Sequence, residues 1–86
     1  MPKRVAAGFK GLAGNIEGVF MIVKINGKEE NIEKGTTLLS LLDLKRVNPN
    51  SVVIEHNYEI PEREKWGEIL VNDGDNIEIV KFMGGG

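Results

Sequence analysis

A β-hairpin is predicted where apolar and polar residues first alternate along the chain. Alternate residues of 21–25 share one face and can point into a core. Asn26 and Gly27 follow, and because both positions tolerate a positive φ, this pair is the strongest short-range signal for a two-residue hairpin turn. The returning strand, residues 28–32, is polar except for Ile32, which is typical of a strand at the edge of a sheet.

A helix is predicted next, because the alternation gives way to a period of about 3.6 residues. The hydroxyl of Thr36 or Thr37 is expected to cap the first turn by accepting a hydrogen bond from a free backbone N–H. Pro49 prevents the helix from continuing. Leucines form the stripe that would face the sheet, three at i, i+3 and i+4 and two that would widen it: Leu38, Leu41, Leu42, and Leu39 and Leu44.

Three further runs have strand character: residues 51–56, 69–71 and 76–82. The predicted order of elements is strand, turn, strand, helix, strand, short strand, strand. This order indicates an α+β roll, in which a mixed four- to five-stranded sheet packs on one main helix. The right-handed crossover rule places the last strand beside the first and parallel to it. The only tryptophan, Trp66, is expected to close one end of the small core.

Composition excludes most kinds of active site. The 86 residues form one small domain of net charge −2, which gives no electrostatic basis for binding nucleic acid or an anionic membrane. No apolar run approaches the length of a membrane-spanning helix. The chain has no cysteine, which excludes disulfides, thiolate metal sites and a cysteine nucleophile.

The remaining candidate groups are interpreted as structural. The single histidine, His56, cannot build a multi-histidine metal site and is expected at the surface or satisfied by a neighbour. Residues 72–75 are interpreted as a turn, because a calcium loop needs more acidic positions and a closing glutamate. We therefore predict no metal site, no bound cofactor and no independent catalytic centre, so the chain is not expected to be an enzyme.

The two ends differ in character from the middle. Residues 1–20 contain four glycines at no phosphate-binding spacing and lack the continuous apolar core of a signal peptide. We expect a disordered leader or an artificial extension there, whose removal leaves folding unchanged. The folded domain is then 21–82, and 83–86 form a C-terminal glycine tail.

The tail is the one part of the sequence with distinctive chemistry. Its last residue, Gly86, carries an α-carboxylate at the end of a flexible tip that has no side chains at Gly84 and Gly85. Such a tip can be threaded into the active site of another protein. An α-carboxyl titrates near ~3.5, so the group is ionised at neutral pH and is a nucleophile, but it is a poor electrophile until it is activated. The alternative is a frayed end without a function.

Several short motifs follow one another in a fixed order from residue 21 to the end of the chain. The motifs are Ile25-Asn26-Gly27, Thr36-Thr37-Leu38, Ile60-x-x-Arg63-x-x-Trp66, Asp73-Gly74-Asp75, Ile77, Ile79 and Gly85-Gly86. Together they resemble the ThiS-type sulfur carriers of thiamine biosynthesis, which belong to the ubiquitin-like β-grasp proteins. This chain differs in having Glu62, where the family commonly has a proline, and Gly84, where it has a small or apolar residue.

The resemblance implies a mechanism in which partners supply what this chain lacks. A ThiF-type activating enzyme would bind Mg-ATP and adenylate Gly86, with Gly84 and Gly85 giving access. A cysteine desulfurase or another persulfide donor would supply sulfur, and the resulting thiocarboxylate would go to a ThiG-type thiazole synthase. The carrier would be a cytoplasmic monomer. It would meet its partners through an apolar patch near the tail, for which the candidates are Phe82, Met83, Val80 and Tyr58.

Three other functions remain open at this point. The small subunit of molybdopterin synthase is a related carrier with the same fold and a terminal Gly-Gly. A ubiquitin-like modifier would instead join Gly86 to lysines of target proteins through isopeptide bonds. A binding domain would not use the tail at all.

Overall fold

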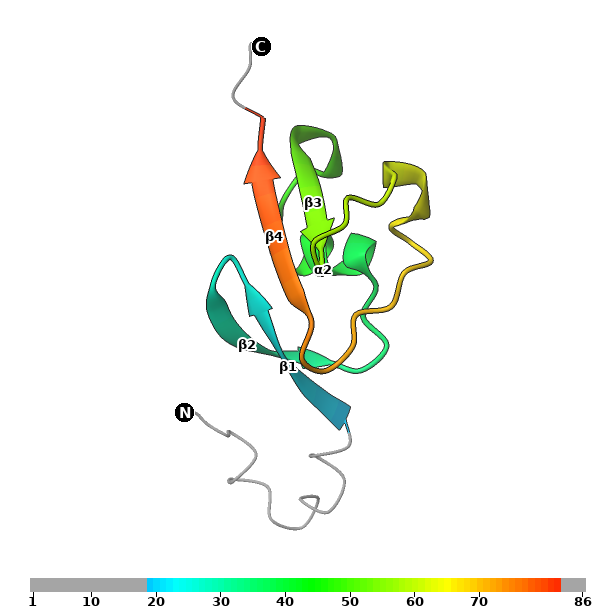
Figure 1. Ribbon diagram of the computed structural model, residues 1–86. Helices are drawn as coiled ribbons and strands as arrows, with labels where there is room; N and C mark the ends of the chain where they lie inside the picture. The colour runs from blue at the N-terminus through cyan, green and yellow to red at the C-terminus, as the bar shows by residue number, and fades with distance from the viewer. Residues whose placement is uncertain (1–18, 83–86) are drawn as a thin grey trace.

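The computed structural model describes residues 19–82, which form a mixed four-stranded sheet with a helix on one face (Figure 1). The strand order is β2-β1-β4-β3, with β1 and β4 parallel and the two outer pairs antiparallel. The last strand therefore lies beside the first, as predicted. The elements are β1 (Phe20–Ile25), β2 (Lys28–Glu33), α2 (Leu38–Leu44), the 3-10 turn η2 (Pro49–Ser51), β3 (Val52–His56), the 3-10 turn η3 (Arg63–Lys65) and β4 (Asn76–Lys81).

The hairpin forms at the predicted turn. Asn26 has a φ of 52° and Gly27 a φ of 86°, the combination that lets a two-residue turn follow the twist of the strands. β1 starts at Phe20, one residue before the expected start of the folded domain. The rest of the expected leader, residues 1–18, lies outside the described residues.

The buried leucine stripe of α2 contains fewer residues than predicted. Of the two candidate threonines, Thr37 caps it: its Oγ1 accepts from the Ser40 N–H at 3.1 Å. Three leucines of the expected stripe are fully buried, but Leu39 and Leu44 are 42% and 64% exposed, so the prediction that they widen the stripe is wrong. Leu39 is turned by about 100° from its neighbour, and Leu44 is the last helical residue.

The prediction of a short strand at 69–71 is also wrong. Leu70 forms only an isolated bridge with Thr37. The two hydrogen bonds around it run from Leu38 N to Ile69 O at 3.0 Å and from Val71 N to Thr36 O at 2.9 Å. Because the opposing chain turns into α2 at this point, the ladder has no further residues with which to pair.

The core lies between the sheet and α2, and Trp66 closes it as predicted. The indole is buried, and its Nε1 donates to the Pro61 carbonyl at 3.1 Å. In the described part of the chain, no helix is long and apolar enough to cross a membrane. The buried apolar residues are Met21, Val23, Ile25, Ile32, Leu38, Leu41, Leu42, Val52, Ile54, Trp66, Val71 and Ile77.

Candidate functional site

The strand β4 is the root of the glycine tail, and it lies in the interior of the sheet (Figure 1). It pairs with β3 over five residue pairs, from Val52↔Lys81 to His56↔Ile77. Beyond its last residue, the Phe82 N–H still donates to the Ser51 carbonyl at 2.9 Å. The tail lies outside the described residues, so the structure describes the chain only up to Phe82, where the tail begins. The tail residues are Met83, Gly84, Gly85 and Gly86.

Two of the predicted contact residues lie together at the end of β4. Val80 and Phe82 are 54% and 55% exposed, and they share the sheet face that points away from α2. Val53 of β3 is directly opposite Val80 and is half-buried on the same face. We call Val53, Val80 and Phe82 the tail-root patch. Sequence reasoning missed Val53, although the alternation in β3 already placed it on the face opposite to buried Val52 and Ile54.

Tyr58, the fourth candidate contact residue, lies elsewhere. It is 78% exposed, but it follows His56, which pairs with Ile77 at the start of β4. The antiparallel register therefore puts Tyr58 at the opposite end of β4 from Phe82. The expectation that Tyr58 lies near the tail root is wrong.

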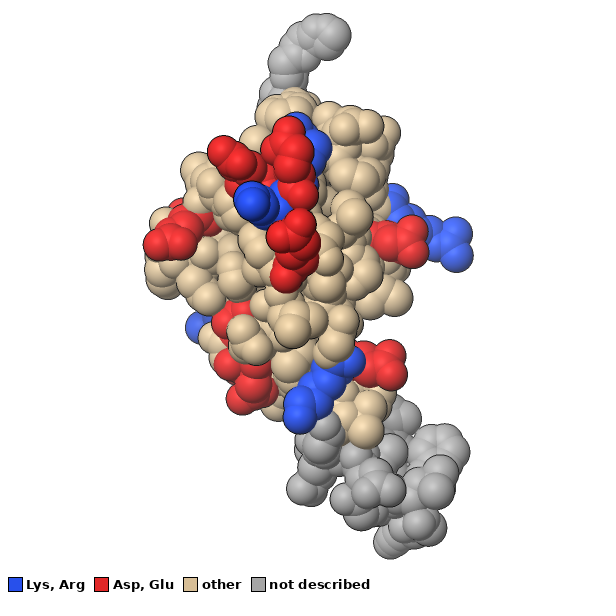
Figure 2. All heavy atoms as spheres, turned by 90° about the vertical axis from the view of Figure 1, so that its right-hand side faces the viewer, with Lys and Arg blue, Asp and Glu red and all other residues tan. Residues whose placement is uncertain are grey.

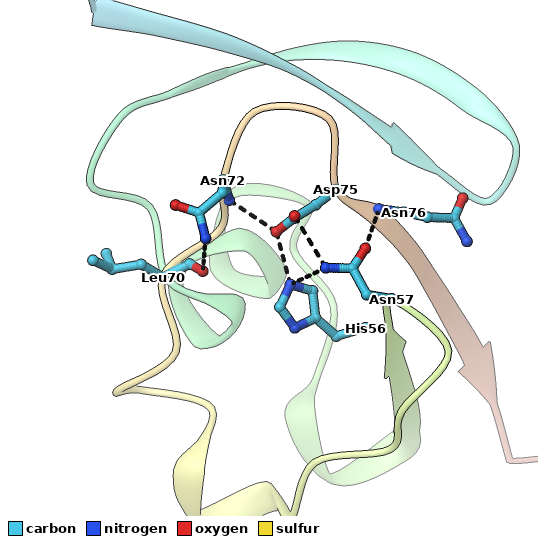
Figure 3. Close-up of polar contacts among 6 residues, drawn as sticks. All are labelled: His56, Asn57, Leu70, Asn72, Asp75 and Asn76. Atoms are coloured by element: carbon cyan, nitrogen blue, oxygen red, sulfur yellow. Dashed lines mark hydrogen bonds and ion pairs between the residues drawn. The ribbon is translucent and has the colours of Figure 1, made fainter.

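The start of β4 is held by a polar network around Asp75 (Figure 3). The Asp75 carboxylate accepts from His56 Nε2 at 2.7 Å, from the Asn72 N–H at 2.8 Å and from Asn57 Nδ2 at 3.1 Å. Because an ionised carboxylate can only accept, His56 Nε2 is the donor. The Oδ1 of Asn57 in turn accepts from the Asn76 N–H at 2.8 Å. His56 is thus satisfied by a neighbour, as predicted.

This network sets the charge state of Asp75, which is only 7% exposed. Burial alone would raise the pKa of the carboxyl group, but the hydrogen bonds from His56, Asn72 and Asn57 outweigh it, so the pKa lies below its ordinary value. Residues 72–75 form a turn around Gly74, which has a φ of 86°. Among residues 19–82 there is no cluster of three or more side chains suited to hold a metal ion.

The Ile60…Arg63…Trp66 motif has a structural role. The Arg63 side chain donates to the Val52 carbonyl at 2.9 Å and to the Pro49 carbonyl at 3.1 Å, and its guanidinium lies 5.1 Å from the centre of the Trp66 ring. It therefore ties the loop before β4 to the start of β3. Glu62 has a φ of −65°, the value that a proline would fix, so its presence leaves the loop in a proline-compatible shape.

The charged side chains form no continuous surface of one sign on the face that Figure 2 shows. Acidic and basic groups are interspersed there on a surface that consists mainly of uncharged residues. With a net charge of −2, this distribution gives no support for a nucleic-acid surface on that face.

Comparison with known proteins adds family information to this geometry. A model of the ThiS family matches residues 23–86. The sulfur carrier protein ThiS of Bacillus subtilis is 38% identical over 66 residues, which cover 76% of this chain and 100% of that protein. A thiazole synthase of Paramagnetospirillum magneticum is 41% identical over 66 residues, but the match spans 77% of this chain and only 20% of that longer protein.

A solved structure matches as well. The crystal structure of a thiamine biosynthesis protein (ThiS) from Geobacter metallireducens has a TM-score of 0.65 and 36% sequence identity, and the match covers 77% of this chain and 100% of that one. A second thiazole synthase, from Magnetococcus marinus, is 38% identical and is again matched over 20% of its length. The chain thus spans about a fifth of both thiazole synthases.

Proposed function

This chain belongs to the ThiS family, and from that premise we propose that it is a sulfur carrier of thiamine biosynthesis whose working group is the Gly86 carboxylate. The observation that carries the proposal is the match through the terminal glycines, together with full coverage of the Bacillus subtilis carrier. The fold agrees, because the tail follows an interior strand that is paired up to Phe82.

The proposed reaction begins with activation of the carboxylate by a ThiF-type partner. A Gly86 carboxylate oxygen attacks the α-phosphate of Mg-ATP, pyrophosphate leaves, and an acyl-adenylate forms. This turns a poor electrophile into one with a good leaving group. The terminal sulfur of a persulfide, formed on a cysteine desulfurase or another donor, then attacks the acyl carbon and displaces AMP. The product is an acyl disulfide that joins Gly86 to the donor cysteine. A second thiol attacks the donor sulfur, forms a new disulfide with it, and releases the Gly86 thiocarboxylate.

The chain acts in this scheme as a co-substrate rather than as an enzyme. It needs no cysteine of its own, because sulfur is carried on the backbone carboxyl group. The absence of side chains at Gly84 and Gly85 gives the activating enzyme access to the carboxylate. We further propose that the carrier works in the cytoplasm, where ATP is available. We also propose that it is a monomer when it is not bound to a partner enzyme.

Docking is proposed to use the tail-root patch together with Met83. Val80 and Phe82 expose apolar area next to the point where the tail begins, so a partner that covers them can also receive the tail. Val53 extends the same surface across to β3.

Thiazole synthase is the acceptor that the comparisons favour. In two thiazole synthases, a segment of about the length of this domain is similar to this chain. Sulfur transfer to molybdopterin synthase is an alternative outcome of the test.

Intact-mass measurement tests the proposal. The full chain is incubated with a ThiF-type activating enzyme, Mg-ATP, cysteine and a cysteine desulfurase, and we expect a mass gain equal to the exchange of one oxygen for one sulfur. A chain lacking residues 84–86 is the control, because it ends in Met83 and has no terminal glycine, and it should stay unmodified. Retention of the mass gain in that chain would disprove the site, and covalent adducts with other proteins would indicate a modifier instead.

The acceptor is tested in a second step. Thiocarboxylated chain is supplied either to a thiazole synthase or to the large subunit of molybdopterin synthase, and sulfur transfer is followed by the return of the carrier mass to its starting value. Transfer to the thiazole synthase alone is the expected result.

A further inference from the structure

We propose that Asn26 is a positioning residue for the glycine tail, because its side-chain amide fixes the end of β4 and so the direction in which residues 83–86 leave the domain. The proposal rests on the proposed function of Gly86. It assigns to the hairpin turn a second task, besides joining β1 to β2.

The observation is a gap in the sheet that one side chain fills. The parallel ladder between β1 and β4 has only two residue pairs and ends at Ile25↔Ile77, where the Asn26 N–H donates to the Ile77 carbonyl at 2.8 Å. Beyond Ile77, β1 has turned away into the hairpin. The Asn26 side chain continues the pairing: its Oδ1 accepts from the Ile79 N–H at 2.7 Å, and its Nδ2 donates to the Ile79 carbonyl at 3.4 Å.

A side-chain amide thus makes to Ile79 the two kinds of hydrogen bond, one accepted and one donated, that a longer neighbouring strand would make. The turn itself does not require them. Glycine or aspartate at the first position would also adopt the φ of 52° that the turn needs. Of these three residues, only asparagine brings an amide that can both accept from and donate to Ile79. The two contacts join residues 53 positions apart in the sequence.

The location of Ile79 gives this contact its functional meaning. Ile79 lies two residues before the end of β4. On the other edge of the strand, the last contact is the hydrogen bond from the Phe82 N–H to the Ser51 carbonyl. Asn26 and Ser51 therefore hold the tail root from its two sides. Without the amide, the edge of β4 that faces β1 has no hydrogen bonds after Ile77. The end of β4 can then rotate about the hydrogen bonds that join it to β3.

A small rotation at the end of β4 produces a large displacement at Gly86. Seven residues separate Ile79 from Gly86, and an extended chain of that length spans about 24 Å. A rotation of about 5° would therefore move the carboxylate by about 2 Å when the tail is extended in the partner's active site. A misplacement of about 1 Å can lower a rate by as much as about a hundredfold. Loss of the Asn26 amide should thus impair the adenylation step more than it impairs docking by the tail-root patch.

A second asparagine provides a matched control within the same molecule. Asn57 has a φ of 51° in the two-residue turn between His56 and Glu59, and its Oδ1 also accepts from a backbone N–H of β4, that of Asn76 at 2.8 Å. The turn conformation and the type of contact are the same. The position differs, because Asn76 is the first residue of β4 and lies far from the tail.

The test compares Asn26→Gly, Asn26→Asp and Asn57→Gly in the full chain. Glycine keeps the positive φ and removes the amide, whereas aspartate keeps the acceptor for Ile79 N–H. Carrier-dependent exchange of pyrophosphate into ATP by the ThiF-type enzyme gives kcat and KM for each variant. We expect Asn26→Gly to lower kcat by about tenfold with KM changed by less than about twofold. Asn26→Asp should recover most of kcat, and Asn57→Gly should keep the wild-type kcat despite a lower Tm.

Hydrogen exchange of the Ile79 amide supplies a readout that does not depend on the partner. It should become faster in Asn26→Gly and remain slow in Asn57→Gly. Equal losses of kcat in the two glycine variants would overturn the proposal in favour of a general stability effect. An unchanged kcat in Asn26→Gly would overturn it directly. If the wild-type chain supported no exchange of pyrophosphate into ATP, the proposed function itself would fail. Faster hydrogen exchange of the Ile79 amide in Asn26→Gly would then show only that Asn26 stabilises the end of β4.

Discussion

The two ends of β4 are built in opposite ways. At its start, Ile77 is fully buried, and Asp75, only 7% exposed, gathers three hydrogen bonds just before the strand begins. At its end, Val80 and Phe82 are more than half exposed, and the backbone is paired with β3 on one edge but held only by the Asn26 side chain on the other. One strand of six residues thus passes from the buried core to an exposed apolar surface.

The difference separates stability from function along a single strand. Regions that bind partners are commonly drawn from the less stable parts of a fold, because they need accessible apolar surface. Here the buried start anchors the strand, so the exposed end can be recognised without endangering the fold. Substitutions at the start should therefore change the free energy of unfolding, and substitutions at the end should change carrier activity.

Truncation of the two apolar side chains gives the largest expected contrast. Ile77→Ala should lower the free energy of unfolding by about 2–4 kcal/mol, because it leaves a cavity in the core. Val80→Ala removes a side chain that is 54% exposed, and it should cost less than about 0.5 kcal/mol. Urea denaturation of both variants measures the difference. Equal losses would mean that the two ends are packed alike.

The polar network gives the next effect. Asp75→Ala leaves the His56 donor, the Asn72 N–H and the Asn57 amide without their shared acceptor, so we expect a loss of about 2–3 kcal/mol. Asp73→Ala in the same turn is the control. It removes one exposed bond, in which Asp73 Oδ1 accepts from the Ile22 N–H at 2.9 Å, and should cost about 0.5–1 kcal/mol. A larger loss for Asp73→Ala would contradict the role assigned to the network.

The same carboxylate predicts how stability depends on pH. Burial opposes ionisation of Asp75, but the hydrogen bonds from His56, Asn72 and Asn57 dominate and hold its pKa below the ordinary value of 3.8. The folded state therefore binds this proton less readily than the unfolded state, and the resulting stability is complete above about pH 5. It is lost as the pH falls from there through the folded-state pKa. Thermal unfolding of Asp75→Asn should show a weaker acid dependence than that of the wild type.

A small gain in stability is expected at Tyr58, which is exposed near the start of β4. Its φ of 71° is unfavourable for a residue with a side chain, so Tyr58→Gly should raise the free energy of unfolding by about 0.5–1 kcal/mol. Carrier-dependent pyrophosphate exchange should be unchanged, because Tyr58 lies at the far end of β4 from the tail. A loss of exchange with retained folding would restore Tyr58 as a partner contact and would break the division between the two ends.

Local signals determined most of the fold. Asn26-Gly27 specified the hairpin turn, and the leucines at i, i+3 and i+4 specified the buried side of α2, because each pattern acts within a few residues. The alternation in residues 76–82 likewise identified the strand that leads to the tail. Where the prediction failed at Leu44 and at 69–71, the outcome depended on where an element ends, whereas Leu39 points about 100° away from buried Leu38 around the helix.

The sequence by itself determined the composition of the candidate site: the glycines at 84–86, no cysteine, and a set of motifs typical of one family. Only the tertiary structure decided which residues surround the root of that tail. The register of β3 against β4 brought Val53 to Val80 and carried Tyr58 away, and the early end of the parallel ladder brought Asn26 to Ile79. Such contacts join residues that are up to 53 positions apart, and no periodicity within either segment encodes the register that brings them together.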